Sequence, residues 1–245
     1  MLTPPHPNPV SLASLAPQVN FPALSLTEWH PFSVSSGPRE ECVELHIRAL
    51  GDHTKEVVAL SKKLALKKEQ TWIRIDGPYG RHDFNYRRYP VVMLVGGGVG
   101  VTPVMGLLRD IYNVGEYSRE EAAHIRHHAI ESVYCCWVVP TETEATWFMR
   151  ELKACMNNAK HIAHMPKLVV WIYVSRAKTA LSPLIAGRPN MGTVFKTIEE
   201  CNPYAESILC FACGPDPMIN ELWDLSFDKT MSGSRVDFVH ETFNF

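Results

Sequence analysis

The chain has 245 residues, of which 46% are hydrophobic and 20% are charged. This composition excludes extensive disorder, and the length allows one large core or two modest ones, so we expect two small domains. A net charge of −2 and a pI near 6.6 exclude a basic surface for nucleic acid. The lysine-rich stretch 62–68 is expected to be a solvated helix face.

The N-terminal residues 1–17 are rich in proline, and we expect them to form a disordered tail. No stretch of the sequence approaches the ~18 to 20 apolar residues that cross a bilayer, and no basic region precedes the first apolar residues. We therefore expect the chain as given to be soluble.

Two patterns follow one another along the chain. In residues 18–88, three β-rich runs and one helical segment predict an antiparallel β-barrel. The runs are residues 31–36, 42–50 and 71–77, and the helix is expected over 53–66. In residues 89–245, alternating strands and helices predict a parallel sheet with helices on both faces, which binds ligands at the carboxyl ends of its strands. The expected strands are 91–96, 132–139, 168–174 and 207–214, and the expected helices are 106–112, 146–156 and 216–226.

A glycine-rich turn follows the first of these parallel strands. Without a Cβ the glycines let the backbone approach a phosphate, and the following helix directs free N–H groups at it. The Lys-Ser/Thr pair of a Walker loop is absent, and Val101 stands where the common dinucleotide fingerprint has its third glycine. The pattern is G-x-G-x-G-x-x-P, with a proline suited to the first helical turn. It predicts a nucleotide site, the alternative being a tight connection without a ligand, and its residues are Gly96, Gly98, Gly100, Thr102 and Pro103.

Cysteine and histidine patterns give no metal site. Seven cysteines without regular spacing indicate reduced thiols and a cytosolic environment. Cys210 and Cys213 form a CxxC at the end of an apolar strand, where buried cysteines are favoured over a dithiol switch, and the second CxxC that zinc requires is missing. Five histidines are expected at the surface, three of them in a polar insertion at 113–131; they are His124, His127, His128, His161 and His164.

Several separated motifs occur together in one order, and they cover nearly the whole chain from about residue 19. They are residues 28–38, 43–54, 72–80, 91–103, 137–141, 173–178, 211–218 and 238–245. The set resembles the dehydrogenase region of the NADPH oxidase and ferric reductase family, itself similar to ferredoxin-NADP reductase. The resemblance implies an FAD-binding barrel followed by an NADPH-binding α/β domain.

The resemblance also implies roles for residues of the barrel. The motif His30-Pro31-Phe32-Ser33 would hold flavin, with His30 at the pyrophosphate, Phe32 against the isoalloxazine and Ser33 near N5. On a strand, His30 and Phe32 would share one face and Ser33 the other. Taken alone, the motif could be an ordinary strand. The resemblance assigns the FAD phosphates to Arg48, Gly51 and Thr54, and the family often has tryptophan where His53 stands.

Coenzyme choice depends on the ends of the second and third parallel strands. The second strand is followed by no acid until Glu142, so a carboxylate for the ribose of NADH is missing. Ser175 and Arg176 follow the third strand and offer a hydroxyl and a guanidinium, which suit a 2′-phosphate. The same pair binds this phosphate in ferredoxin-NADP reductases. We therefore expect NADPH, although an isolated arginine could simply face solvent.

Three further expectations concern the reacting rings. By resemblance, Cys213, Gly214 and Pro215 would lie beside the nicotinamide, and Phe245 would cover the flavin; burial in the core is the alternative for Cys213 and Phe245. Hydride would pass from NADPH C4 to FAD N5, with Ser33, Cys213 and Phe245 positioned at the rings and no residue acting as acid or base.

The resemblance implies a partner, and this sequence differs from family members in one respect. Electrons would pass singly to haem in a transmembrane domain or subunit at the cytosolic face of a membrane, and then to oxygen or a ferric chelate. Family barrels begin several strands earlier, whereas here only residues 19–21 fit the preceding strand, so we expect an open barrel with an exposed edge. The alternative function is a nucleotide-binding or interaction module without turnover.

Overall fold

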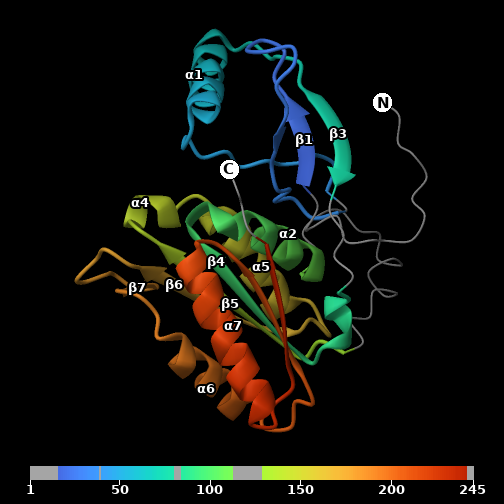
Figure 1. Ribbon diagram of the computed structural model, residues 1–245, viewed down its shortest axis with the longest axis vertical. Coiled ribbons are helices and arrows are strands. Elements are labelled where there is room, and N and C mark those ends of the chain that lie inside the picture. The colour runs from blue at the N-terminus through green and yellow to red at the C-terminus, as the bar shows by residue number, and fades with distance from the viewer. Residues whose placement is uncertain (1–15, 39, 80–83, 113–128, 242–245) are drawn as a thin grey trace.

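The computed structural model describes residues 16–38, 40–79, 84–112 and 129–241. A three-stranded antiparallel sheet is followed by a six-stranded parallel sheet with helices packed against it (Figure 1). The fold class predicted from the sequence is confirmed. Among these residues, no helix is both long and apolar enough to cross a bilayer.

The first sheet has the strand order β2-β1-β3, with β1 at Ala16–Asn20, β2 at His30–Pro31 and β3 at Arg74–Tyr79. β1 pairs antiparallel with both neighbours, so the described sheet is open at β2 and at β3. β1 begins at Ala16, so the expectation of a disordered tail is wrong for Ala16 and Pro17; residues 1–15 lie outside the described residues.

The strands expected over residues 31–36 and 42–50 do not form, and a single bridge joins Val34 to Leu45. Side chains take the place of the ladder here: the Glu44 N–H donates to Ser36 Oγ at 3.0 Å, and Ser35 Oγ donates to the Glu44 carbonyl at 3.1 Å. Because β2 ends at Pro31, strict alternation fails, and Phe32 and Ser33 are both buried.

The predicted helix of this half is confirmed as α1, Asp52–Lys67. Thr54 Oγ1 accepts the N–H groups of Leu50 and Gly51 at 2.9 and 3.0 Å and so caps the N-terminus. The helix ends at Lys68, which has the left-handed φ of 56°. Its lysines are exposed, as expected from the sequence.

The second sheet has the order β7-β6-β5-β4-β8-β9, and all neighbouring strands are parallel. Its strands are β4 at Val91–Gly97, β5 at Ser132–Val139, β6 at Lys167–Val174, β7 at Leu184–Ala186, β8 at Ile208–Cys213 and β9 at Val236–Glu241. The four predicted strands are the central ones, whose continuous apolar runs reflect burial on both faces. The outer strands β7 and β9 were not predicted, because they are short or partly polar.

Helices cover both faces of this sheet, and α4 and α6 were not predicted. They are α2 at Val101–Ile111, α4 at Glu142–Ala145, α5 at Met149–His161, α6 at Met191–Cys201 and α7 at Asp216–Met231, with short turns η2 at Tyr86–Arg88 and η3 at Gly98–Gly100. Val92 and Leu94 of β4 pack in the core with α2 and α5, whereas Met93 and Val95 pack with α6 and α7.

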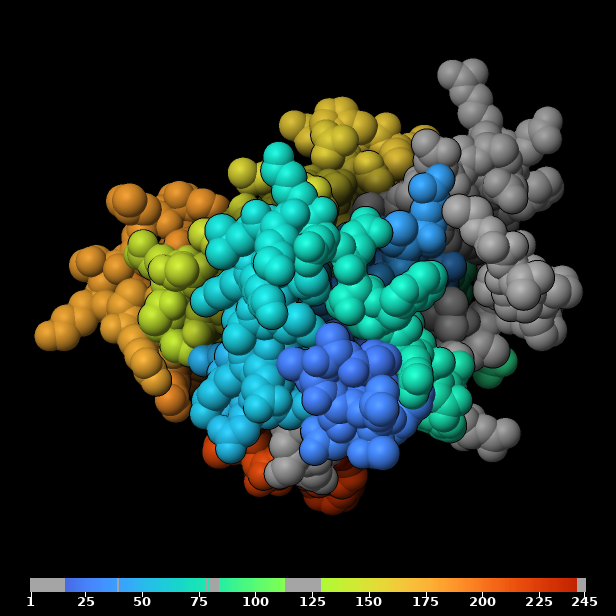
Figure 2. Space-filling view, turned by 90° about the horizontal axis from the view of Figure 1, so that it is seen from above, coloured from blue at the N-terminus to red at the C-terminus, as the bar shows by residue number. Residues whose placement is uncertain are grey.

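The N-terminal half lies over the larger sheet on the side of the glycine turn (Figure 1). Viewed from above, α1 and the first sheet cover the centre of the molecule, and the C-terminal half is visible around them (Figure 2). Arg48 reaches from the N-terminal half to within 3.6 Å of where a Cβ on Gly98 would lie. The two halves therefore meet at the predicted nucleotide site.

Candidate cofactor site

The glycine turn between β4 and α2 is the centre of the site. A Cβ on Gly97 would lie 2.6 Å from Pro215 Cδ, and a Cβ on Gly100 would lie 2.4 Å from the Cys213 carbonyl oxygen. Gly98 has a φ of +58°, and its carbonyl accepts the Trp137 indole N–H at 3.0 Å. Gly97 and Gly100 leave no room for a side chain, because the turn packs directly on the end of β8 and the residues after it, and the positive φ of Gly98 favours glycine.

A cleft of about 820 Å³ opens above this turn. Its walls come from the carboxyl ends of the parallel strands, as the fold class predicts, and from Arg48 and Leu50 of the N-terminal half. The wall residues of the C-terminal half are Gly97–Gly100, Val138–Pro140, Ser175, Arg176, Arg188, Pro189, Met191, Gly214–Met218 and Glu221.

Cations line the cleft in two places. The predicted pair Ser175 and Arg176 follows β6, and Arg188 follows β7 at the same edge of the sheet. Arg188 was missed in the sequence, because β7 is too short to be recognised; the available signal was a Gly-Arg-Pro sequence at a possible strand end. A phosphate group between Arg176 and Arg188 would receive charge-assisted hydrogen bonds.

Arg48 is the cation at the glycine turn. Its Nη2 pairs with Glu144 Oε1 of α4 at 3.2 Å, and its guanidinium lies 6.0 Å from the centre of the Trp147 ring. The other Glu144 carboxylate oxygen is buried and has no hydrogen-bond partner among the described residues. The sequence assigned Arg48 to an FAD phosphate; the structure places it on the wall of the cleft.

Some predicted site residues support the turn and do not face the cleft. Thr102 and Pro103 are buried in α2, and Thr102 Oγ1 donates to the Val99 carbonyl at 3.0 Å. Gly96 is also buried, with a hypothetical Cβ only 2.8 Å from Val101 Cα. These residues support the glycine turn without facing the cleft.

The CxxC cysteines are buried strand residues, as the sequence favoured. Cys210 and Cys213 are both fully buried. Burial raises the pKa of Cys210 to about 12 and also raises the pKa of Cys213, where Glu241 adds to the effect. These thiols stay protonated near neutral pH, which does not suit a reactive dithiol. Gly214 and Pro215, but not the Cys213 thiol, line the cleft.

The predicted flavin motif lies beside the α1 N-terminus. Phe32 and Ser33 are buried, and the Phe32 ring packs edge-to-face on Phe21 with centroids 6.4 Å apart. His30 stacks on His53 at 3.9 Å, and His30 Nε2 is buried without a hydrogen-bond partner among the described residues. Burial lowers the pKa of His30, the charge of His53 lowers it further and Glu28 opposes both. An unpaired donor or acceptor at this place fits a phosphate ligand such as that of FAD.

Two sequence-family models match the chain. The FAD-binding domain matches residues 17–83, and the ferric reductase NAD binding domain matches residues 89–183. Both matches fit the dehydrogenase region of the NADPH oxidase and ferric reductase family, which the chain resembles. It therefore contains the FAD-binding and NAD-binding domains of this family, which support FAD and NADPH as cofactors.

Relatives within this family cover nearly all of the chain. Respiratory burst oxidase homolog protein B of Solanum tuberosum is 26% identical over 92% of the chain, and NADPH oxidase 1 of Mus musculus is 27% identical over 83%. The aligned parts are 31% and 36% of those proteins, so the chain spans about a third of the relatives it matches.

Solved structures share the fold at low sequence identity. A mutant ferredoxin-NADP+ reductase from Plasmodium falciparum, in complex with 2'P-AMP, has a TM-score of 0.61 and 10% identity, with 93% of this chain and 83% of that one covered. The CS-b5R domains of human Ncb5or have a TM-score of 0.60 and 15% identity, with 91% and 59% covered. The likeness shows that this chain has the ferredoxin reductase-like fold.

Some residues singled out in the sequence, one in a family motif and three in the polar insertion, lie outside the described residues. They are Phe245, His124, His127 and His128. His161 and His164 are exposed, as expected.

Proposed function

We propose that the chain transfers electrons from NADPH through FAD to a one-electron acceptor. The cleft carries the proposal, because its walls offer phosphate ligands in two separate places, the turn at Gly97–Gly100 and the pair Arg176 and Arg188. A nucleotide with a pyrophosphate and a 2′-phosphate requires both. The FAD-binding domain match over residues 17–83 supplies the second cofactor.

The residues of the nucleotide cleft bind and orient the coenzyme. The turn and the α2 N-terminus hold its pyrophosphate, and Arg176 with Ser175 and Arg188 holds its 2′-phosphate. Gly214 and Pro215 bound the space for the nicotinamide. Cys213 lies next to this space and offers its backbone to the nicotinamide, because its thiol is buried.

The residues of the N-terminal half bind the flavin. His30 contacts the pyrophosphate, and the other phosphate ligands are Arg48, Gly51 and Thr54 at the start of α1. Pro31 restrains the backbone between His30 and Phe32. Phe32 and Ser33 contact the ring system. The bound cofactors supply the chemistry, a hydride transfer from NADPH C4 to FAD N5. The chain contributes positioning and exclusion of water, and Phe245 as a cover over the flavin stays a prediction.

The test begins with flavin-free protein titrated with FAD, followed by NADPH without oxygen. We expect FAD to bind and its oxidised absorbance to bleach. Arg176→Ala should weaken NADPH by about tenfold to hundredfold and NADH far less, because a charge-assisted hydrogen bond contributes about 1.5–3 kcal/mol. Lys178→Ala, exposed and outside the cleft wall, is the matched control.

Equal loss of NADPH and NADH affinity in Arg176→Ala would exclude the phosphate clamp. FAD that binds but is not bleached by NADPH would favour the alternative of a binding module without turnover. The proposed acceptor is haem of a transmembrane domain or subunit, which places this chain at the cytosolic face of a membrane. Reduction of haem in added membranes, followed by its absorbance, tests that step.

A further inference from the structure

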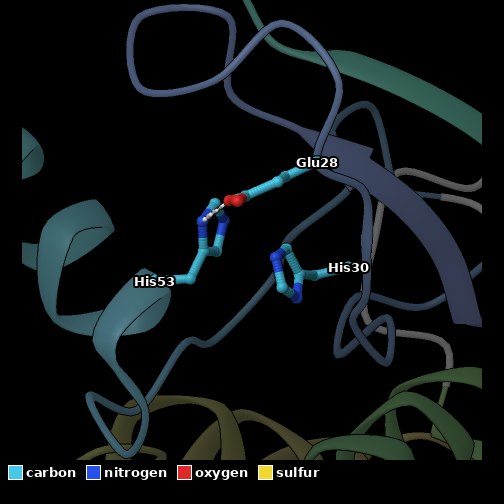
Figure 3. A group of neighbouring side chains, drawn as sticks. All are labelled: Glu28, His30 and His53. Atoms are coloured by element: carbon cyan, nitrogen blue, oxygen red, sulfur yellow. Dashed lines mark ion pairs between the residues drawn. The ribbon is translucent and has the colours of Figure 1, made fainter.

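Three metal-binding side chains meet beside the first sheet, outside the nucleotide cleft. Glu28 precedes β2, His30 lies in β2, and His53 is in the first turn of α1 (Figure 3). The sequence predicted no metal site here, because Glu28 and His30 are separated from His53 by more than twenty residues. The fold brings the two segments together.

The geometry of this Glu28–His30–His53 cluster is close to that of a metal site. Glu28 Oε2 lies 3.3 Å from His53 Nδ1, and one ligand atom from each residue lies within 4.8 Å of the others. Two nitrogen ligands on one tetrahedral Zn²⁺ are about 3.4 Å apart. The imidazole rings are stacked at 3.9 Å with 21° between their planes, so they must rotate to direct their lone pairs at a shared ion.

A second observation indicates a missing ligand. His30 Nε2 and His53 Nε2 are buried and have no hydrogen-bond partner among the described residues, whereas His53 Nδ1 faces Glu28 Oε2. Buried polar atoms in folded proteins are almost always paired. The Glu28 carboxylate lies beside the two rings, and its side chain is 59% exposed, which leaves one side of the cluster open to water.

We propose that Glu28, His30 and His53 bind a divalent transition metal ion such as Zn²⁺ when FAD is absent. Two imidazoles and a carboxylate, with a fourth position for water, suit Zn²⁺, whereas Mg²⁺ and Ca²⁺ prefer sites built of oxygen. Resting on the proposed function, the metal competes with FAD, because His30 is also the residue assigned to the flavin pyrophosphate.

The binding test uses the untagged, flavin-free protein and Co²⁺ as a spectroscopic probe, with Zn²⁺ added to displace it. We expect a d–d absorption band that saturates at one equivalent, and at least tenfold weaker binding in His53→Ala and in Glu28→Gln. His161→Ala is the matched control, being an exposed histidine at the end of α5. Glu28 is mostly exposed, so Glu28→Gln keeps the test valid if His53→Ala fails to fold.

A combined His124→Ala, His127→Ala and His128→Ala variant tests whether the histidine-rich stretch binds the Co²⁺ in place of the cluster. Loss of the Co²⁺ band in this variant, or its persistence in His53→Ala and Glu28→Gln, would overturn the proposal.

The competition test measures FAD affinity with and without Zn²⁺. We expect Zn²⁺ at saturation to weaken FAD binding to the unaltered chain by at least tenfold, and to have little effect on Glu28→Gln. If FAD fails to bind at all, the proposed function fails, and the Co²⁺ titration still decides the metal site. If FAD binds equally well with Zn²⁺ present, competition is excluded.

Discussion

At the residue scale, Arg48 lies where the N-terminal half meets the glycine turn. The sequence motif assigned it to FAD, and the structure holds it above Gly98 through an ion pair with Glu144. Only one Glu144 oxygen is used in this pair, and the other is buried without a partner in the described part of the chain. The pair thus fixes a cation between the N-terminal half and the glycine turn.

A pH-dependent stability is predicted from His46. Its ring packs on Phe148 at 4.1 Å, and burial lowers its pKa, as does Arg109, while Glu44 and Glu151 raise it. With the folded pKa below the ordinary value of 6.5, both states are neutral above that pH. Below it the unfolded state binds the proton first, so the free energy of unfolding falls, by at most about 1.4 kcal/mol per pH unit.

His46→Gln should remove this part of the acid sensitivity while keeping a partner for Ser35 Oγ, which lies 2.7 Å from His46 Nδ1. Urea unfolding between about pH 8 and pH 5 measures it. His161→Gln, at an exposed position, should retain the full pH dependence. Identical pH profiles for His46→Gln and the unaltered chain would contradict the prediction.

The sequence predicted the residues that a motif names, and it missed those that only tertiary contacts select. Gly98 and Gly100 were identified by spacing, but Gly97 is required because Pro215 packs against it. Arg176 followed a long apolar strand and was recognised, whereas Arg188 follows the three-residue β7. Assembly of the fold, and no local pattern, brings such residues together.

At the element scale, the long buried strands were predictable and the N-terminal strands were not. Each of β4, β5 and β8 is buried on both faces, so its sequence is a continuous apolar run that can be recognised. The stretch 42–50 alternates apolar and polar residues, as a half-buried strand would, but pairs through a single bridge. Side-chain bonds from Ser35 and Ser36 replace the ladder there, which β-propensity does not reveal.

The turn before α2 gives a prediction for the element as a whole. A Cβ at Gly100 would lie 2.4 Å from the Cys213 carbonyl oxygen, so Gly100→Ala must push the turn off the end of β8. We expect a loss of about 1–3 kcal/mol in the free energy of unfolding and at least about tenfold weaker NADPH binding, because the amide groups of the turn lose their alignment.

Gly192→Ala is the control for that measurement. In the first turn of α6 its Cβ would lie 3.3 Å from the Asn190 side-chain oxygen and 3.9 Å from Leu225 Cδ2, and alanine favours helix by up to about 1 kcal/mol. Stability should stay level or rise slightly, with NADPH affinity unchanged. Denaturation and coenzyme titration on both variants provide the comparison, and a Gly100→Ala chain that binds NADPH normally would show that the turn tolerates displacement.

At the scale of the whole molecule, α2 joins the two halves through consecutive residues. Arg109 bonds the Ser35 carbonyl at 3.2 Å and pairs with Glu40 and Glu44 of the N-terminal half. Asp110 pairs with Arg87 at 3.1 Å in the connection η2. Because α2 also begins at the phosphate turn, a single helix carries the nucleotide site and the contacts that hold the flavin half over it.

The contacts of Arg109 predict how far the two halves depend on this link. Arg109 is 4% exposed, so Arg109→Leu leaves Glu40 and Glu44 without their cation at a mostly buried junction. We expect a loss of about 3 kcal/mol, near the lower limit for a broken buried ion pair because Glu44 keeps some contact with water. Adding Glu40→Leu to this variant should recover part of the loss, since removing the second charge relieves its desolvation.

Unfolding followed by tryptophan fluorescence and by far-UV circular dichroism tests this link. In the unaltered chain the two signals should change together, whereas in Arg109→Leu the N-terminal half should unfold at lower denaturant. Lys196→Ala, which breaks the exposed pair with Glu200 at 3.8 Å, should cost less than about 0.5 kcal/mol. If Arg109→Leu unfolds like Lys196→Ala, the two halves are held together by apolar packing, and α2 does not connect the flavin half to the nucleotide site.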